Sequence, residues 1–66
     1  MDFKKAVKVG FALKGGNQQD VAKLIQVAAP TFSNWMNGKT QPNLQDLKNI
    51  AVYFDVSLSI FILWGE

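Results

Sequence analysis

The side chains that could do chemistry in this chain are carboxylates, amides, hydroxyls and lysine ammonium groups, because the sequence contains neither cysteine nor histidine. That absence excludes disulfides, thiolate nucleophiles, zinc sites and imidazole acid–base catalysis. The acidic residues are scattered at spacings that suit helix caps and first turns rather than a paired-carboxylate site: Asp2, Asp20, Asp46, Asp55 and Glu66. We therefore predict a protein that is not an enzyme, with no catalytic residue, metal, cofactor or small-molecule substrate.

The positive charge comes from seven lysines without any arginine, and the net charge is +2. Such a mild excess permits nucleic-acid binding without requiring it. The absence of arginine is more informative, because the planar guanidinium fork is the usual bidentate reader of guanine and lysine is a less rigid substitute.

Amide and hydroxyl side chains are concentrated between Asn17 and Pro42, a segment whose pattern predicts two short helices joined by the turn Gln26-Val27-Ala28. This is the layout of a helix-turn-helix, whose second helix is shaped to enter the major groove of DNA. The segment therefore makes double-stranded DNA the predicted partner.

Helical periodicity predicts the element that precedes this segment. A first helix is expected from about Asp2 to Lys14, with Asp2 capping its start and Gly15-Gly16 ending it. Gly10 lies inside this helix and indicates a place where another helix approaches closely. The expected apolar face consists of Phe3, Ala6, Val7, Gly10 and Leu13.

The two short helices of the central segment have recognisable boundaries. The first should begin after the N-cap Asn17 and run from Gln18 to Ile25, and the second should run from Ala29 to Asn37 and end at Gly38. Pro30 suits the second helix because it falls in the first turn, where its missing N–H has no partner to lose. The residues expected to face inward are Val21, Ala22, Leu24, Ile25, Phe32, Trp35 and Met36.

The rest of the chain is also helical by pattern. Asn43 should cap a fourth helix, supported by Asp46, and a last short helix should run from Leu58 to Leu63 after Ser57. The apolar residues of the fourth helix are Leu44, Leu47, Ile50, Ala51 and Phe54. Five helices in 66 residues, without a repeat or a linker, predict a single compact all-α domain over residues 1–66.

The run from Ile60 to Trp64 is apolar nearly all round the last helix, which is more than one buried side requires. Exposed apolar surface usually marks an interface, so we expect a homodimer contact formed by Ile60, Leu63 and Trp64, the alternative being that these residues cap the core. The run is far too short to span a bilayer, and the basic start of the chain lacks the features of a secretory signal. A cytoplasmic protein without a membrane partner is therefore expected.

Several short motifs along Phe3–Glu66 occur in an order and spacing that resemble one known family. They are Gln18 at the start of the second helix, Ala22 at the helix crossing, Val27 in the turn, Phe32-Ser33-Asn34-Trp35, Asn37-Gly38-Lys39, and Asp55-Val56-Ser57-Leu58. The chain resembles the Cro/CI-type helix-turn-helix domain of phage repressors and bacterial regulators, the xenobiotic-response-element family. The resemblance implies a five-helix, lambda-repressor-like fold whose second and third helices form the helix-turn-helix.

The resemblance also implies roles for particular residues. Asn17 and Gln18 would contact a phosphate, and the loop residues Asn37, Lys39 and Thr40 would contact the DNA backbone on the far side of the groove. For Asn17 the alternative or additional role is capping, and for Lys39 it is a solvated charge. The base-contacting positions carried over are Ala28, Ala29, Pro30, Thr31, Ser33 and Asn34.

These base-contacting residues have little hydrogen-bonding capacity. Alanine, proline and the threonine methyl group can pack against thymine methyls, while Asn34 could bind adenine through its amide. We therefore expect an A·T-leaning preference supplemented by DNA shape and dimer spacing. For Ser33 and Asn34 the alternative is a hydrophilic helix face without base contact.

Three positions depart from the family pattern. Gln26 occupies a turn position often held by glycine and would need a left-handed conformation. Ala29-Pro30 replaces polar residues that many repressors direct at bases. Phe11 stands where several relatives have a basic residue near the phosphates, although its spacing is more typical of a core residue.

Taken together, the sequence predicts a transcriptional regulator that binds a pseudo-palindromic operator as a dimer. It resembles either a Cro-like stand-alone repressor or the DNA-binding part of a larger CI-like repressor. The alternative is a protein-interaction module, antitoxin-like or anti-repressor, which the apolar last helix and the few polar groups at positions 28–31 favour. Salt dependence of binding would distinguish the two.

Overall fold

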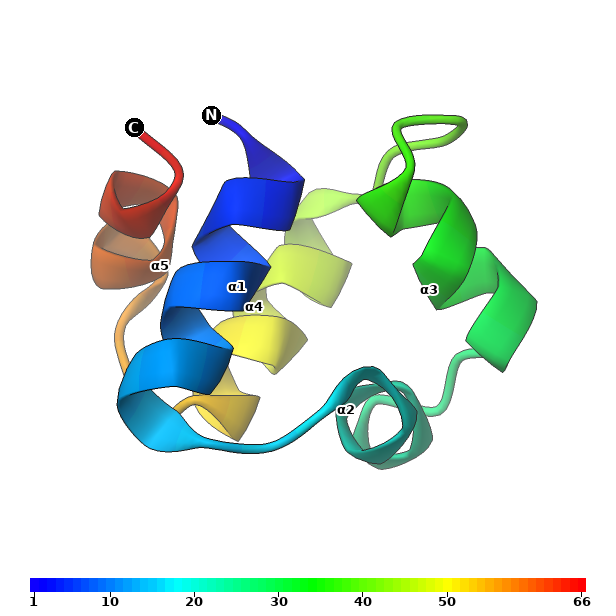
Figure 1. The fold of residues 1–66 in the computed structure, drawn as a ribbon, viewed down its shortest axis with the longest axis horizontal. Coiled ribbons are helices and arrows are strands. Elements are labelled where there is room, and N and C mark those ends of the chain that lie inside the picture. Colours follow the sequence, from blue (N-terminus) through cyan, green and yellow to red (C-terminus); the bar gives the residue numbers. More distant parts are fainter.

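The computed structural model describes all residues from Met1 to Glu66 and confirms the predicted all-α class. Its five helices are α1 (Phe3–Lys14), α2 (Gln18–Leu24), α3 (Ala29–Met36), α4 (Leu44–Tyr53) and α5 (Leu58–Trp64). α1 packs against α3 and α5, α4 packs against α2 and α5, and α2 packs against α3. The pair α2–α3 therefore lies on one side of the domain and α5 on the other, with α1 and α4 between them (Figure 1).

Four of the five helices, all except α3, begin where a side chain accepts a hydrogen bond from a free backbone N–H group. Asp2 accepts a hydrogen bond from the Lys5 N–H (3.1 Å), and Ser57 Oγ accepts one from the Ile60 N–H (3.2 Å). At the start of α4, Asn43 and Asp46 each accept a hydrogen bond from the other's backbone N–H, which is a complete capping box. These local contacts explain why the predicted helix starts are confirmed.

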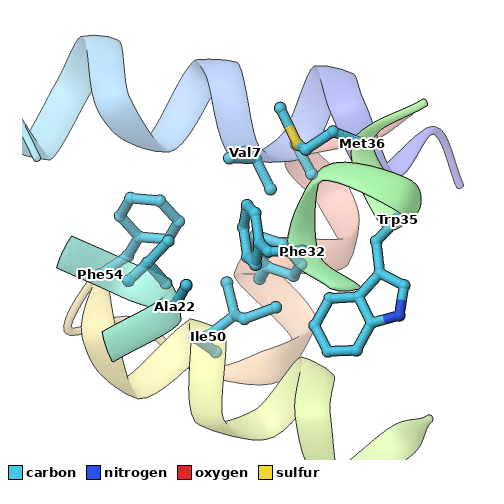
Figure 2. Close-up of a cluster of buried hydrophobic side chains, with 11 residues drawn as sticks. Val7, Ala22, Phe32, Trp35, Met36, Ile50 and Phe54 are labelled. Carbon is cyan, nitrogen blue, oxygen red and sulfur yellow. The ribbon is translucent and has the colours of Figure 1, made fainter. Parts of the chain in front are cut away.

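Aromatic side chains dominate the core. The largest fully buried residues are Phe32, Phe54, Phe61, Ile50, Val7 and Val21. Phe32 of α3 lies between Val7 of α1 and Ile50 of α4 (Figure 2). Because no polar side chain is buried with them, the contacts between side chains in the interior are apolar.

Gly10 is the position where α1 meets the end of α4. A Cβ atom at Gly10 would lie 2.6 Å from the ring of Phe54, which is closer than carbon atoms can approach. The prediction of a close approach at Gly10 is therefore confirmed, and the approaching group is an aromatic ring. Phe11, beside it, is half-buried with its ring centroid 5.6 Å from that of Phe54, so it packs against the core.

Three leucines that the pattern placed on buried faces are exposed instead. Leu13, Leu24 and Leu44 are 65%, 61% and 59% exposed. Each lies in the first or last turn of its helix, and in a domain of only 25 × 20 × 20 Å these ends extend past the helices that cover the middle. The expectation that they contribute to the core was wrong because periodicity gives the side of a helix and not its covered length.

The two connections α2–α3 and α4–α5 have the same backbone geometry, a repeat that the sequence reading missed. Gln26 (φ 62°) and Asp55 (φ 58°) are both left-handed, so the predicted left-handed conformation of Gln26 is confirmed. In both turns the next residue donates a 3.0 Å hydrogen bond back into the helix, Val27 to the Ala22 carbonyl and Val56 to the Ala51 carbonyl. This is the Schellman pattern, here without glycine at the left-handed position.

No single helix is long and apolar enough to cross a membrane, and only α4 and α5 together, bent by 91° at their junction, reach the required length and composition.

Candidate nucleic-acid interface

The start of α2 is built around Asn17. Its side-chain oxygen accepts a hydrogen bond from the Asp20 N–H (2.9 Å), and its Nδ2 donates to the Asp20 carboxylate (3.3 Å). The predicted capping role of Asn17 is thus confirmed, and both ends of its amide are engaged. Gln18, the first residue of the helix, is exposed.

The turn after α2 places the start of α3 on the surface. Ala28 is the N-cap of α3 and makes no side-chain capping bond, while Pro30 lies in the first turn as predicted. Ala28, Ala29, Pro30 and Thr31 are all exposed. Apart from the hydroxyl of Thr31, the side chains in the first turn of α3 therefore present methyl and methylene groups.

The two sides of α3 have different compositions. Phe32, Trp35 and Met36 are buried, as predicted from their spacing. Ser33 and Asn34 are half-buried on the other side. Their backbones are fixed by the apolar contacts of Phe32 and Trp35, so the polar side chains are carried on a rigid helix.

A shallow groove connects α2 and α3. Its lining includes Gln18, Ala29, Pro30 and Ser33, so the structure brings the first predicted phosphate-contacting residue next to three predicted base-contacting residues. Gln19 lines the same groove, and the sequence reading did not single it out. Its position directly after Gln18, with a second amide, was the available signal.

The loop after α3 is attached to the end of that helix. Asn37 is the C-cap and Gly38 (φ 75°) reverses the chain. The N–H groups of Lys39 and Thr40 then donate to the carbonyl oxygen of Asn34, at 3.0 and 3.5 Å. Asn37, Lys39 and Thr40 are exposed, so the loop holds three polar side chains at the opposite end of α3 from Gln18.

The charged groups are all near the surface. All seven lysines are exposed: Lys4, Lys5, Lys8, Lys14, Lys23, Lys39 and Lys48. No group of three or more His, Cys, Asp or Glu side chains is close enough to hold a metal ion. The polar chemistry of the interface therefore consists of amide and hydroxyl groups together with the charge of Lys39.

The three residues predicted for self-association differ in their exposure. Ile60 and Leu63 are 41% and 64% exposed, whereas Trp64 is half-buried with its ring centroid 5.8 Å from that of Phe54. Trp64 thus packs against the core, as the alternative interpretation required for this residue. Ile62 is 37% exposed and adds apolar surface that the sequence reading did not select.

The polar start of α2, the outer side of α3 and the loop after it are arranged as in a helix-turn-helix, and a family model described as Helix-turn-helix matches residues 11–61. The chain belongs to the Cro/CI-type helix-turn-helix family. Membership in this DNA-binding family supports a role in transcription regulation, and the family is generally non-enzymatic. No curated protein is significantly similar to the chain.

Proposed function

We propose that this helix-turn-helix protein is a transcriptional repressor that binds a pseudo-palindromic operator as a homodimer and acts in the cytoplasm. The observation that carries the proposal is the continuity of one exposed surface. The groove joins Gln18 to the first turn of α3. The loop with Lys39 and Thr40 is hydrogen-bonded to the last turn of the same helix. A helix lying in a major groove needs such polar groups at both of its ends, because the phosphate backbones run along both edges of the groove.

In this proposal the DNA backbone is held at two places. Gln18, with Asn17, contacts a phosphate beside α2, and Asn37, Lys39 and Thr40 contact the backbone beside the loop. Gln18 contributes more than Asn17, because the Asn17 amide already bonds to Asp20 and the Asp20 carboxylate repels a phosphate. These contacts fix the position of the protein without reading sequence.

Base recognition is assigned to the outer side of α3. Ala28, Ala29, Pro30 and the methyl group of Thr31 would pack against thymine methyl groups, and Ser33 and Asn34 would supply the hydrogen bonds. Since the chain has no arginine for guanine, the operator should be rich in A·T pairs at these positions. DNA shape and half-site spacing then supply part of the specificity.

The proposed dimer forms through α5. Ile60 and Leu63 expose apolar surface on a helix that packs on α1 and α4, away from α2 and α3, so self-association leaves the DNA-binding surface free. Trp64 contributes to this contact through its exposed part and otherwise supports α5 from the core side. Two linked half-sites multiply a modest affinity for each, and occupancy of promoter DNA represses transcription.

The test is fluorescence anisotropy with random and promoter-derived duplexes over a series of salt concentrations. Binding should weaken steeply as salt rises, because lysine–phosphate contacts release counterions. Absence of binding to any duplex at low salt would refute the repressor. Salt-insensitive binding to a protein partner in place of DNA would instead support the interaction module, which the apolar surface of α5 favours.

Selection of bound duplexes from a random pool tests the finer claims. An enriched site with two A·T-rich halves about one helical turn apart supports the dimer and the assignment of α3. An enriched site without internal symmetry would contradict the homodimer, and a site dominated by G·C pairs would contradict the base contacts.

A further inference from the structure

A cavity of about 290 Å³ lies between the start of α1 and the loop that follows α3. Its apolar lining includes Phe3, Trp35 and Leu47, and its polar lining includes Lys4, Thr40 and Gln41. Lys4 follows Phe3 in the sequence, 36 residues before Thr40. In the structure it borders the same cavity as a loop residue far away in the chain.

We propose that Lys4 and Thr40 together bind one phosphate of the DNA backbone at the mouth of this cavity. The inference rests on the proposed DNA-binding function and adds α1 to the surface that holds the DNA. Lys4 supplies a flexible positive charge, and the Thr40 hydroxyl supplies a directed hydrogen bond, which is a common combination at phosphates. Both residues are exposed, so a backbone passing the loop can reach both of them.

The loop is held in place for this contact. Lys39 and Thr40 donate their N–H groups to the Asn34 carbonyl, which couples the position of Thr40 to α3. Phe3 couples the start of α1 to the same helix, because its ring contacts Phe32 and Trp35 at centroid distances of 5.9 and 6.2 Å. The loop at Thr40 and the start of α1 beside Lys4 are therefore both attached to α3, the helix proposed to enter the groove.

Lys5 and Lys8, the neighbouring lysines of α1, share a second, more open hollow with Lys4. The Lys5 Nζ donates to the carbonyl oxygen of Glu66, on the α5 side of α1. Neither Lys5 nor Lys8 lines the cavity. Lys4 is thus the lysine of α1 that the structure brings to the loop.

Asp2 also borders the cavity, and its negative charge disfavours an anion inside it. Its carboxylate accepts a hydrogen bond from the Lys5 N–H (3.1 Å) and remains at the start of α1. A free anion inside the cavity would meet this negative charge. A phosphate of a passing DNA strand stays at the mouth, where Lys4 and Thr40 reach it.

The experiment measures the affinity of the full chain for one promoter-derived duplex as a function of salt. The logarithm of the association constant falls linearly with the logarithm of the salt concentration. Removing one phosphate contact should make this negative slope shallower by about 0.9. Lys4→Gln should show this change and weaken binding to all duplexes alike, by roughly two- to fivefold at low salt. Lys4→Arg should retain the slope of the unmodified chain, since it keeps the charge.

Lys5→Gln is the matched control, because it removes the same charge from the adjacent position of the same helix. It should leave the slope unchanged, and circular dichroism should report an unchanged helix content for both variants. An unaltered slope for Lys4→Gln would overturn the proposal, and so would equal losses for Lys4→Gln and Lys5→Gln, which would reveal only a general effect of net charge.

A double-mutant cycle with Thr40→Val tests whether the two residues share a phosphate. If they do, the combined loss of affinity is smaller than the product of the two single losses. A loss equal to that product would overturn the shared contact. If the unmodified chain binds no duplex, the proposed function itself fails, and this result is distinct from binding that does not depend on Lys4.

Discussion

The helix pairs α2–α3 and α4–α5 have the same turn and buried residues of the same kind, but their exposed surfaces differ in chemistry. Val21, Ala22 and Phe32 of the first pair correspond, at a constant spacing along the chain, to Ile50, Ala51 and Phe61 of the second. All six are buried. Trp35 and Trp64 also correspond, although Trp64 is less deeply buried.

The exposed positions of the two pairs correspond as well. Thr31, Ser33 and Asn34, the predicted base-contacting residues, match Ile60, Ile62 and Leu63 of α5. The same local structure thus presents hydroxyl and amide groups in one pair and apolar groups in the other. Packing constrains the residue types at buried positions, whereas the residue types at exposed positions can suit a binding partner. In our proposal this partner is DNA for α3 and a second copy of the chain for α5.

The strongest test of this correspondence removes the equivalent buried rings. Phe32→Ala and Phe61→Ala should each lower the free energy of unfolding by about 3–5 kcal/mol, because both rings are fully buried and leave cavities. Urea denaturation followed by circular dichroism measures both losses. A loss below about 1 kcal/mol for either variant would show that the two pairs do not support the core equally.

The next test concerns the residue before each left-handed position, where the two pairs differ. Ile25 in the first pair is half-buried, whereas Phe54 in the second is buried against Gly10. Gly10→Ala should therefore lower the free energy of unfolding by about 1–3 kcal/mol through overpacking, although alanine favours helices. Thermal unfolding measures this effect, and a more stable variant would contradict the close contact with Phe54.

A control variant separates packing from helix propensity. Ala12 is exposed on the same helix, so Ala12→Gly should cost about 1 kcal/mol through propensity alone. At position 10 the protein is expected to be less stable with alanine than with glycine. At position 12 it is expected to be more stable with alanine than with glycine. Only packing against Phe54 explains this opposite behaviour.

Exchange of an exposed residue tests the difference between the two surfaces. Leu63→Asn places in α5 the residue type found at the equivalent position of α3, and it should weaken self-association about tenfold by removing apolar contact. The free energy of unfolding of the monomer should hardly change, because Leu63 is 64% exposed. Sedimentation equilibrium measures the association.

The matched variant is Asn34→Ala, which should weaken binding to some DNA sequences and leave self-association unaltered. If the unmodified chain is monomeric at every concentration, α5 does not form the proposed dimer. If Asn34→Ala disrupts the dimer instead, the roles of the two surfaces are reversed.

The smallest effect is expected in the turns themselves. Gln26→Gly should raise the free energy of unfolding by about 0.5–1 kcal/mol, because glycine adopts a positive φ without steric cost. Asp55→Gly should raise the free energy of unfolding by a smaller amount, since aspartate tolerates the left-handed conformation better than glutamine. Differential scanning calorimetry resolves both shifts, and destabilisation by Gln26→Gly would indicate that the glutamine side chain makes a contact important for the turn.

Local sequence signals predicted the helices well and their exposed surfaces less well. Asp2, Asn17 and Asn43 cap the helices that they were expected to cap, because a capping bond joins residues three positions apart. Periodicity correctly placed Phe32, Trp35 and Ile50 inside. It failed for Leu13, Leu24 and Leu44, because whether the end of a helix is covered depends on where other helices cross it.

The candidate interface divides in the same way. The proximity of Gln18 to the start of α3 follows from the predicted helix-turn-helix, since a short turn leaves α2 and α3 little freedom in their packing. The different burial of Trp64 and Leu63 does not follow from the local sequence, because it depends on the position of Phe54, the C-cap of α4.

Neighbouring residues along the chain were enough to predict where each helix begins, which segment forms the helix-turn-helix and that α5 is apolar. Only the tertiary structure decided which apolar side chains remain exposed, that two turns share one geometry, and that Lys4 reaches the loop carrying Thr40. The physical reason is that burial and proximity depend on the crossing of helices that are distant in sequence, which no local pattern records.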